Sequence, residues 1–214
     1  MSLSYSWRGG EELWPRYGAN LPIQAIIIQP LFEEANRCRR LLVSVMRELA
    51  ANGIGSVLPD LPGTGESRTE ISEVAFSDWH KALLAVGEIL KPSVVASLRG
   101  GALLDGAIPA KGYWRFAPET GARIVRDLKR TQLSGSALYA GHAISDDFLV
   151  TLEGTTPTLV SPLRTVRLES DAGEADAKLA GSPLWRRAEP GDDPALAAAL
   201  VADLTEWVKT CAAL

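Results

Sequence analysis

Short apolar runs alternate along the chain with longer segments whose apolar residues recur every three or four positions. The first clear run, Ile23–Ile28, is rich in β-branched residues and bounded by prolines. Runs of this kind between turn signals are typical of buried strands in a parallel sheet. The expected strands are Ile23–Ile28, Ile54–Leu58, Val94–Ser97, Gly112–Phe116 and Thr165–Leu168. One or two short edge strands are also expected within the first 20 residues.

Segments of helical period separate these strands. The expected helices are Asn36–Asn52, a helix capped by Ser77 or Asp78 that ends near Leu90, a helix beginning near Ala102, Ala122–Leu133, and Pro194–Ala212. Alternation of strand and helix predicts an α/β fold with a mostly parallel sheet flanked by helices. The 214 residues are enough for one domain, residues 1–214, with little or no cap.

Composition and charge exclude several classes of protein. An apolar fraction of 46% is too high for a disordered chain. A net charge of −4 argues against nucleic-acid binding, which needs a basic surface. No apolar stretch reaches the ~20 residues of a membrane span, and Met1–Trp14 has no signal-peptide core. A cytoplasmic protein is expected, with Cys38 and Cys211 as reduced thiols and with no metal or cofactor.

Three segments carry a resemblance to a known family. The turn Asp60–Ser67 reads D-x-x-G-x-G-x-S after an expected strand, Pro30–Arg40 follows the first long strand, and Leu98–Ala102 forms a glycine-rich turn. Together they resemble the type 2 exosortase A system-associated hydrolases, in the α/β-hydrolase superfamily. Later segments that resemble the same family are Trp114–Gly121, Ala140–Ser145 and Trp185–Glu189. The resemblance implies a role beside bacterial exopolysaccharide production, with a partner from that pathway.

The serine that this superfamily uses for catalysis is missing from its place. A hydrolase of this fold carries G-x-S-x-G at the turn after a central strand, the nucleophile elbow. The matching segment here is Ser97–Gly101, which puts Arg99 at the nucleophile position. A guanidinium stays protonated and cannot attack a carbonyl carbon. Ser97 is a candidate nucleophile, but it lies two residues earlier in the strand, where a small packed residue is the favoured interpretation.

No histidine occupies the expected place either. The catalytic histidine of this fold follows the last strand, and the stretch from Glu169 to Pro194 contains none. His80 lies inside an expected helix and His142 precedes the last strand, so neither is expected to reach the elbow. Asp171 matches the position of an acid, but a carboxylate without a histidine makes no triad. Cys38, near the start of a helix, has no histidine partner and is interpreted as structural.

Charged residues gather instead in the loops at the carboxyl ends of the strands. These loops are expected to contain four charged residues: Glu33, Glu34, Arg99 and Glu189. Trp185 precedes Glu189 by four residues. A partly buried arginine needs an anionic partner. Arg99 is therefore expected to pair with Glu33 or Glu34, or with an acidic group on an external ligand.

Three functions stay open on this basis. The first is a binding protein or catalytically altered homologue that takes an anionic small molecule or a partner protein. The second is an esterase or thioesterase with non-standard catalytic residues. The third is an interaction module that uses the cationic helix Ala122–Leu133.

Overall fold

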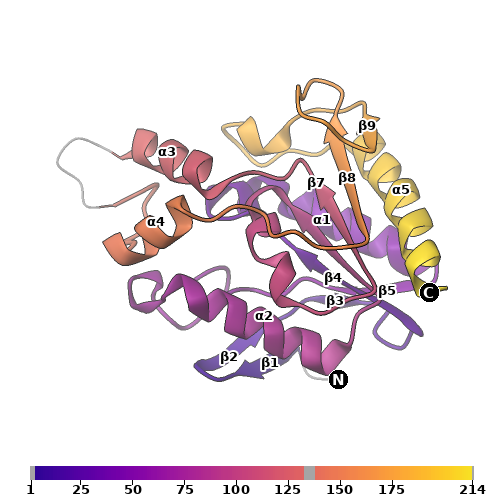
Figure 1. Cartoon of the computed structure of the whole chain (residues 1–214), viewed down its shortest axis with the longest axis horizontal. Helices are drawn as coiled ribbons and strands as arrows, with labels where there is room; N and C mark the ends of the chain where they lie inside the picture. Colours follow the sequence, from indigo (N-terminus) through magenta and orange to yellow (C-terminus); the bar gives the residue numbers. More distant parts are fainter. Residues whose placement is uncertain (1–2, 133–137, 214) are drawn as a thin grey trace.

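The computed structural model describes residues 3–132 and 138–213 (Figure 1). Within this part of the chain, the main sheet has the strand order β3 (Arg16–Tyr17), β5 (Ile54–Val57), β4 (Ile23–Ile28), β6 (Val94–Leu98), β7 (Gly112–Phe116), β8 (Leu163–Leu168) and β9 (Ala177–Leu179). Strand β3 runs antiparallel to β5, and every other neighbouring pair in this sheet is parallel.

The five strands expected from the apolar runs all lie in this sheet and are parallel to one another. β6 takes an interior position, where Ser97 pairs with Ile28 of β4 and Arg115 of β7. The turn after β6 therefore emerges from the middle of the sheet. Strand β9 is absent from the sequence prediction because it has only three residues, Ala177 and Leu179 half-buried and Lys178 exposed, and shows no apolar run.

The N-terminal segment forms a separate hairpin from β1 (Ser4–Trp7) and β2 (Gly10–Leu13). Tyr5 is buried in it, and its hydroxyl donates a 2.6 Å hydrogen bond to the carbonyl oxygen of Asp60. Of the one or two edge strands expected within the first 20 residues, β3 is at the edge of the main sheet, whereas β1 and β2 form a sheet of their own. The hairpin thus holds the base of the turn that follows β5.

Helices cover both faces of the sheet (Figure 1). One face packs against α1 (Glu33–Ala51) and α5 (Pro194–Ala212), and the other against α2 (Phe76–Leu90), α3 (Gly121–Thr131) and α4 (Asp146–Glu153). The alternation of side chains along β4 divides its residues between two cores. Ala25 and Ile27 belong to the α1–α5 core, whereas Ile26 and Ile28 belong to the opposite one. This double burial explains why the strand is apolar throughout.

The α-helix expected near Ala102 is wrong. The chain there forms two short 3₁₀ helices, η2 (Arg99–Leu103) and η3 (Asp105–Ala107). Glycines at 100, 101 and 106 disfavour an α-helix. Only a short connection is available before β7 begins at Gly112, so a full crossover helix does not form.

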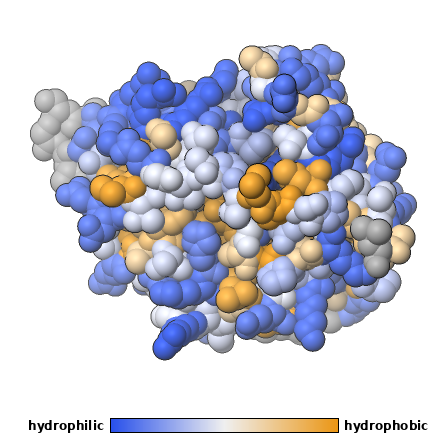
Figure 2. All heavy atoms as spheres, viewed as in Figure 1, coloured by the Kyte–Doolittle hydropathy of each residue, from blue (hydrophilic) through white to orange (hydrophobic). Residues whose placement is uncertain are grey.

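Two short helices lie between β7 and β8 in the chain, in place of a larger cap domain. They are α3 and α4, which pack against each other (Figure 1). Helix α3 begins one residue earlier than expected, and Leu133, the expected end, lies outside the described residues. Figure 2 shows a largely hydrophilic face with hydrophobic residues in a few patches. Among the described residues, no helix has both the length and the apolar character to cross a membrane.

Two further 3₁₀ turns complete the chain. η1 (Ile71–Glu73) precedes α2, and η4 (Leu184–Arg186) lies between β9 and α5. The second of these contacts α1 and brings Trp185 to the carboxyl edge of the sheet.

Candidate functional site

Arg99 occupies a strained turn directly after β6. Its φ is +52°, a left-handed value that a residue with a side chain seldom adopts. Glycine is required two residues later, because a Cβ on Gly101 would lie 2.7 Å from the carbonyl oxygens of both Ile28 and Gln29. The turn is therefore built like a nucleophile elbow, with a guanidinium where the reactive side chain would stand.

The guanidinium of Arg99 is held by two carboxylates. Nε and Nη2 each donate a 3.2 Å hydrogen bond to one of the two oxygens of Glu34 in the first turn of α1. Nη1 donates to Glu119, at 3.3 Å, and to the carbonyl oxygen of Ala117, at 3.2 Å. The bidentate geometry with Glu34 is the strong form of an arginine–carboxylate contact. The expected pair with Glu33 or Glu34 is thus confirmed for Glu34.

Trp185 closes the other side of this group. The Arg99 Cζ atom lies 4.8 Å from the centre of the Trp185 ring, a cation–π contact. Arg37 fixes the backbone at that point, since its Nη1 donates a 2.9 Å hydrogen bond to the Trp185 carbonyl oxygen. Only 8% of the Arg99 side chain remains exposed. Arg99, Glu34, Glu119 and Trp185 are called the Arg99 cluster below.

Burial and charge act in opposite directions within the Arg99 cluster. Burial raises the pKa of Glu34 above its usual range, and the positive charge of Arg99 offsets only part of that effect. Burial also works against the charged form of Arg99, but Glu34 and Glu119 outweigh it and raise the Arg99 pKa. The guanidinium is therefore charged at every physiological pH and cannot serve as a base.

Ser97 belongs to a different network of buried polar side chains. It is fully buried, and its hydroxyl donates a 2.7 Å hydrogen bond to Asp105. Asp105 in turn accepts two hydrogen bonds from Arg115, at 2.7 and 2.8 Å. Arg115 also donates to the carbonyl oxygen of Thr158. This buried network joins β6, η3 and β7 beneath the elbow, so Ser97 has a structural role.

Neither histidine reaches the elbow, as the sequence predicted. His80 Nδ1 lies 3.4 Å from the carbonyl oxygen of Phe76, one turn earlier in α2. His142 lies in the segment before α4, and its Nε2 is 3.2 Å from Glu33 Oε1. Glu33 thus pairs with His142 while its neighbour Glu34 pairs with Arg99.

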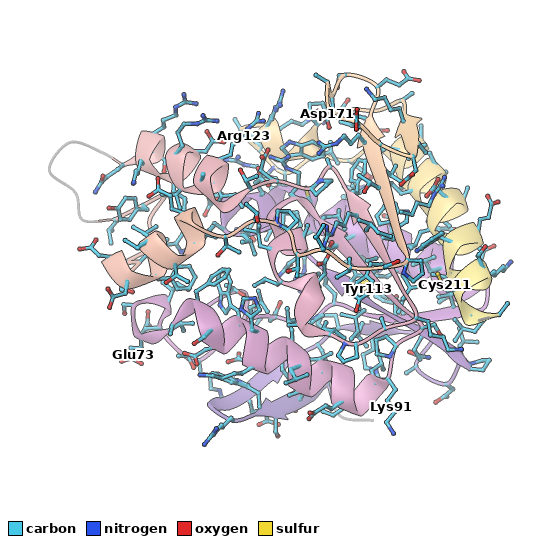
Figure 3. The ribbon with its side chains drawn as sticks, viewed as in Figure 1. Glu73, Lys91, Tyr113, Arg123, Asp171 and Cys211 are labelled. Carbon is cyan, nitrogen blue, oxygen red and sulfur yellow. The ribbon has the colours of Figure 1, made fainter. Side chains whose placement is uncertain are left out.

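The remaining candidate acids lie apart from this group. Asp171 follows β8 (Figure 3), and one of its buried carboxylate oxygens has no hydrogen-bond partner among the described residues. Glu189 is exposed and lines neither of the cavities described below. The expectation that Glu189 belongs to the site therefore finds no supporting contact.

Cys38 lies one full turn inside α1, which begins at Glu33 rather than at Asn36. It is fully buried, and this burial raises the pKa of its thiol to about 12. A thiol in this setting is packed and protonated, which agrees with a structural interpretation.

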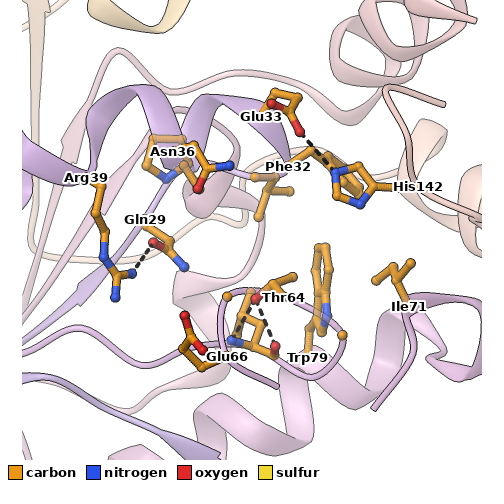
Figure 4. Close-up of a pocket in the computed structure, with 16 residues that line it drawn as sticks. Gln29, Phe32, Glu33, Asn36, Arg39, Thr64, Glu66, Ile71, Trp79 and His142 are labelled. Carbon is orange, nitrogen blue, oxygen red and sulfur yellow. Dashed lines mark hydrogen bonds and ion pairs between the residues drawn. The ribbon is translucent and has the colours of Figure 1, made fainter. Parts of the chain in front are cut away.

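Two cavities flank the N-terminal end of α1. The first, called the Gln29 cavity, has a volume of about 360 Å³ and lies between the segment after β4 and the turn after β5 (Figure 4). The second, called the Arg99 cavity, has a volume of about 330 Å³ and lies between α1, α3 and Trp185. Both are large enough for a small ligand, and both lie at the carboxyl edge of the sheet, where ligands bind in open α/β folds.

Two residues central to this geometry do not appear among the sequence-based candidates. Glu119 follows β7, the strand beside β6, and it provides the second carboxylate for Arg99. The sequence signal for Glu119 is its position in the loop that begins at Ala117, directly after an expected strand, where functional side chains of a parallel sheet gather. Asp105 is fully buried between Ser97 and Arg115, and nothing in its local sequence distinguishes it from a solvated turn residue.

The sequence matches no protein-family model and no curated protein. Solved structures give whole-chain similarity instead. Est1E from Butyrivibrio proteoclasticus with ferulic acid bound is 15% identical, with a TM-score of 0.68 and full coverage of both chains. Mouse alpha/beta hydrolase domain-containing protein 10 is 15% identical, with a TM-score of 0.66 over 98% of this chain and 99% of the other.

A third similar structure is XC6422 from Xanthomonas campestris, described as an α/β serine hydrolase without a lid. It is 14% identical, with a TM-score of 0.55, and the match covers 99% of this chain and 92% of the other. At these identities the likeness concerns the fold alone. The central parallel sheet, the helices on both faces and the elbow after β6 lead to the same conclusion: the chain has the α/β-hydrolase fold.

Proposed function

We propose that this protein is a catalytically silent α/β-hydrolase homologue that binds a ligand at the carboxyl edge of its sheet. One observation carries the proposal: Arg99 stands at the elbow and is held by Glu34 and Glu119. A charged guanidinium in two ion pairs can neither attack a carbonyl carbon nor accept a proton. The cavities on either side of α1 remain available for binding without turnover.

The alternative is an esterase or thioesterase with non-standard residues. Its best support is the contact between His142 and Glu33, which resembles the acid–histidine half of a triad. No serine or cysteine among the described residues makes a hydrogen bond to His142, so this pair has no nucleophile to activate. The alternative therefore depends on a residue that the contacts do not supply.

An interaction module based on α3 is less well supported. Three cations of that helix already pair with acids of the same chain, Arg123 with Glu119, Lys129 with Glu153 and Arg130 with Asp127. Paired surface charges offer less to an acidic partner than free ones do. The resemblance to exosortase-associated hydrolases supports a cytoplasmic role beside exopolysaccharide production, and the ligand or partner would come from that pathway.

Labelling with a covalent fluorophosphonate probe distinguishes a catalytically silent protein from an active serine hydrolase. The proposal expects no labelling of the native protein and no turnover of p-nitrophenyl or thioester substrates, with an active serine hydrolase as the positive control. Labelling that disappears in Ser97→Ala would overturn the proposal and favour the esterase. A variant with Arg99→Ser tests the turn itself, and it should stay unlabelled because no histidine reaches that position.

A further inference from the structure

The wall of the Arg99 cavity contains two arginines that pair with no acid of the described residues. Each carboxylate in that wall already has a cationic partner: Glu34 with Arg99, Glu119 with Arg99 and Arg123, Asp127 with Arg130, and Glu33 with His142. Arg37 and Arg186 line the same cavity and take part in none of these pairs. The cavity therefore presents two guanidinium charges to a ligand, which favours an anion.

Arg37 is fixed in position by the backbone of the neighbouring turn. It is half-buried, and its Nη1 donates a 2.9 Å hydrogen bond to the carbonyl oxygen of Trp185. This bond restricts a long side chain, so less conformational entropy is lost when an anion binds. Both oxygens of Glu34 in the same wall are taken by Arg99, which leaves the remaining donors of Arg37 for a ligand. Arg186 follows Trp185 directly in η4, so both arginines belong to the wall around that ring.

Trp185 adds an independent observation. It lines the Arg99 cavity and is only 2% exposed. Its indole Nε1 is buried and has no hydrogen-bond acceptor in the part of the chain that the structure describes. A buried donor without a partner costs free energy, which an acceptor oxygen brought to this wall would recover. The ligand should therefore carry its oxygen atoms beside Trp185.

Another part of the wall is apolar. It is formed by Leu31 and Leu128, which are buried, and by Ile124, which is half-buried. Leu31 and Ile124 lie over the elbow, since a Cβ added at Gly100 would be 2.9 Å from Leu31 Cγ and 2.6 Å from Ile124 Cδ1. These side chains offer no hydrogen bonds, so the part of the ligand that meets them must be apolar too.

We infer that the Arg99 cavity binds the anion of an amphipathic monocarboxylic acid, of the type of a medium-chain fatty acid. The carboxylate lies between Arg37 and Arg186 and accepts from the Trp185 indole, because a guanidinium holds a carboxylate by charge-assisted hydrogen bonds. The apolar tail lies along the surface of Leu31 and Ile124. The carboxylates already in the wall oppose a second negative charge on the ligand, which disfavours a phosphate dianion. This inference rests on the proposed function, in that the ligand is bound and not hydrolysed.

Isothermal titration calorimetry with hexanoate, octanoate and decanoate tests the inference. The affinity should rise about fourfold for each added CH₂ group until the cavity is filled, because each group buries apolar surface. The uncharged analogue 1-octanol should bind about tenfold more weakly than octanoate, since it forms no charge-assisted hydrogen bonds. Inorganic phosphate should not compete with octanoate.

Variants of the two arginines test the position of the carboxylate. Arg186→Gln changes an exposed residue, and Arg37→Met keeps an apolar stem without the charge. Each should weaken octanoate binding by about tenfold. Arg187→Gln is the matched control, because Arg187 is an exposed arginine one position later that lines neither cavity. It should bind octanoate as the native protein does.

The indole of Trp185 provides a second readout. Trp185→Phe keeps an aromatic ring but removes the N–H donor, and it should bind octanoate several-fold more weakly. In a proton–nitrogen correlation spectrum, the native protein gives indole signals from six tryptophans, and the signal missing from Trp185→Phe belongs to Trp185. That signal should shift when octanoate is added to the native protein.

Four results would overturn the inference. They are no binding of any of the three acids, equal affinity for octanoate and 1-octanol, competition by phosphate, or an equal effect of Arg186→Gln and Arg187→Gln. A Trp185 indole signal that octanoate leaves in place would remove the contact with that residue. Fluorophosphonate labelling separates this test from that of the proposed function. An unlabelled protein that binds no carboxylate would remove this inference alone, and a labelled protein whose octanoate binding depends on Arg186 would remove the silent-enzyme proposal alone.

Discussion

Arg99, at the turn after β6, and Glu34, in the first turn of α1, are joined by two parallel hydrogen bonds of 3.2 Å. They lie 65 residues apart in sequence, so the contact ties the elbow to the helix that follows β4. Glu34 also lies where a helix N-terminus favours negative charge. The turn after β6 is therefore occupied by an internal ion pair.

Arg99→Ala should lower the free energy of unfolding by about 3–5 kcal/mol, because it leaves the half-buried carboxylates of Glu34 and Glu119 without their shared cation. Urea unfolding followed by tryptophan fluorescence measures the change. Arg123→Ala serves as the control, since Arg123 contacts the same Glu119 but is 47% exposed, and its loss should cost under about 1 kcal/mol. Equal stability of Arg99→Ala and the native protein would show that the pair has no structural role.

In the buried network beneath the elbow, loss of Asp105 should lower the free energy of unfolding more than loss of Ser97. Asp105→Ala leaves Arg115 buried without a counter-charge and should cost about 3–5 kcal/mol of unfolding free energy. Ser97→Ala removes a single hydrogen bond to that carboxylate and should cost about 1–2 kcal/mol. Chemical denaturation of both variants tests the order. A larger loss for Ser97→Ala than for Asp105→Ala would contradict the structural role given to Ser97.

Asp203 should make stability depend on acid pH. Burial alone would raise its pKa, but hydrogen bonds from Arg164 and from Trp114 Nε1 outweigh burial and lower it. A folded-state pKa below the unfolded value means that the folded protein binds fewer protons. The stabilisation is therefore present above pH about 4 and is lost as the pH falls below that value.

Asp203→Asn should remove this part of the pH dependence. Thermal unfolding between pH 3 and pH 7, at about one-unit steps, should show a smaller acid loss in the variant than in the native protein. Asp127→Asn, at a largely exposed ion pair of α3, is the matched control and should leave the curve unchanged. Parallel curves for the native protein and Asp203→Asn would refute the assignment.

Both cysteines should be unreactive in the folded protein. Cys38 and Cys211 are fully buried, and burial raises the pKa of each thiol, to about 12 for Cys38. Ellman's reagent at pH 8 should find no accessible thiol in the native state and both thiols after unfolding in urea. Cys38→Ala should reduce the unfolded count to one. Rapid reaction of native Cys38 would contradict the packed setting described for it.

The strands of the sheet could be predicted from the sequence because their burial shows in the local pattern of apolar residues. Ile23–Ile28 is apolar at nearly every position, and such a run between turn signals is typical of a strand covered on both faces. The same local reasoning located Arg99 in the turn after an interior strand and showed that no histidine follows the last one. Composition and spacing suffice where the structure depends on neighbouring residues.

Tertiary structure decided which charges meet. Glu33 and Glu34 are adjacent in sequence, yet successive residues of a helix point in directions about 100° apart, so one contacts His142 and the other Arg99. Glu119 joins Arg99 because parallel β6 and β7 end side by side at the same edge. Arg39 of α1 contacts both Gln29 and Asp60, which follow two different strands, β4 and β5. Such pairings follow from strand order and helix rotation in three dimensions, which no local pattern of the sequence encodes.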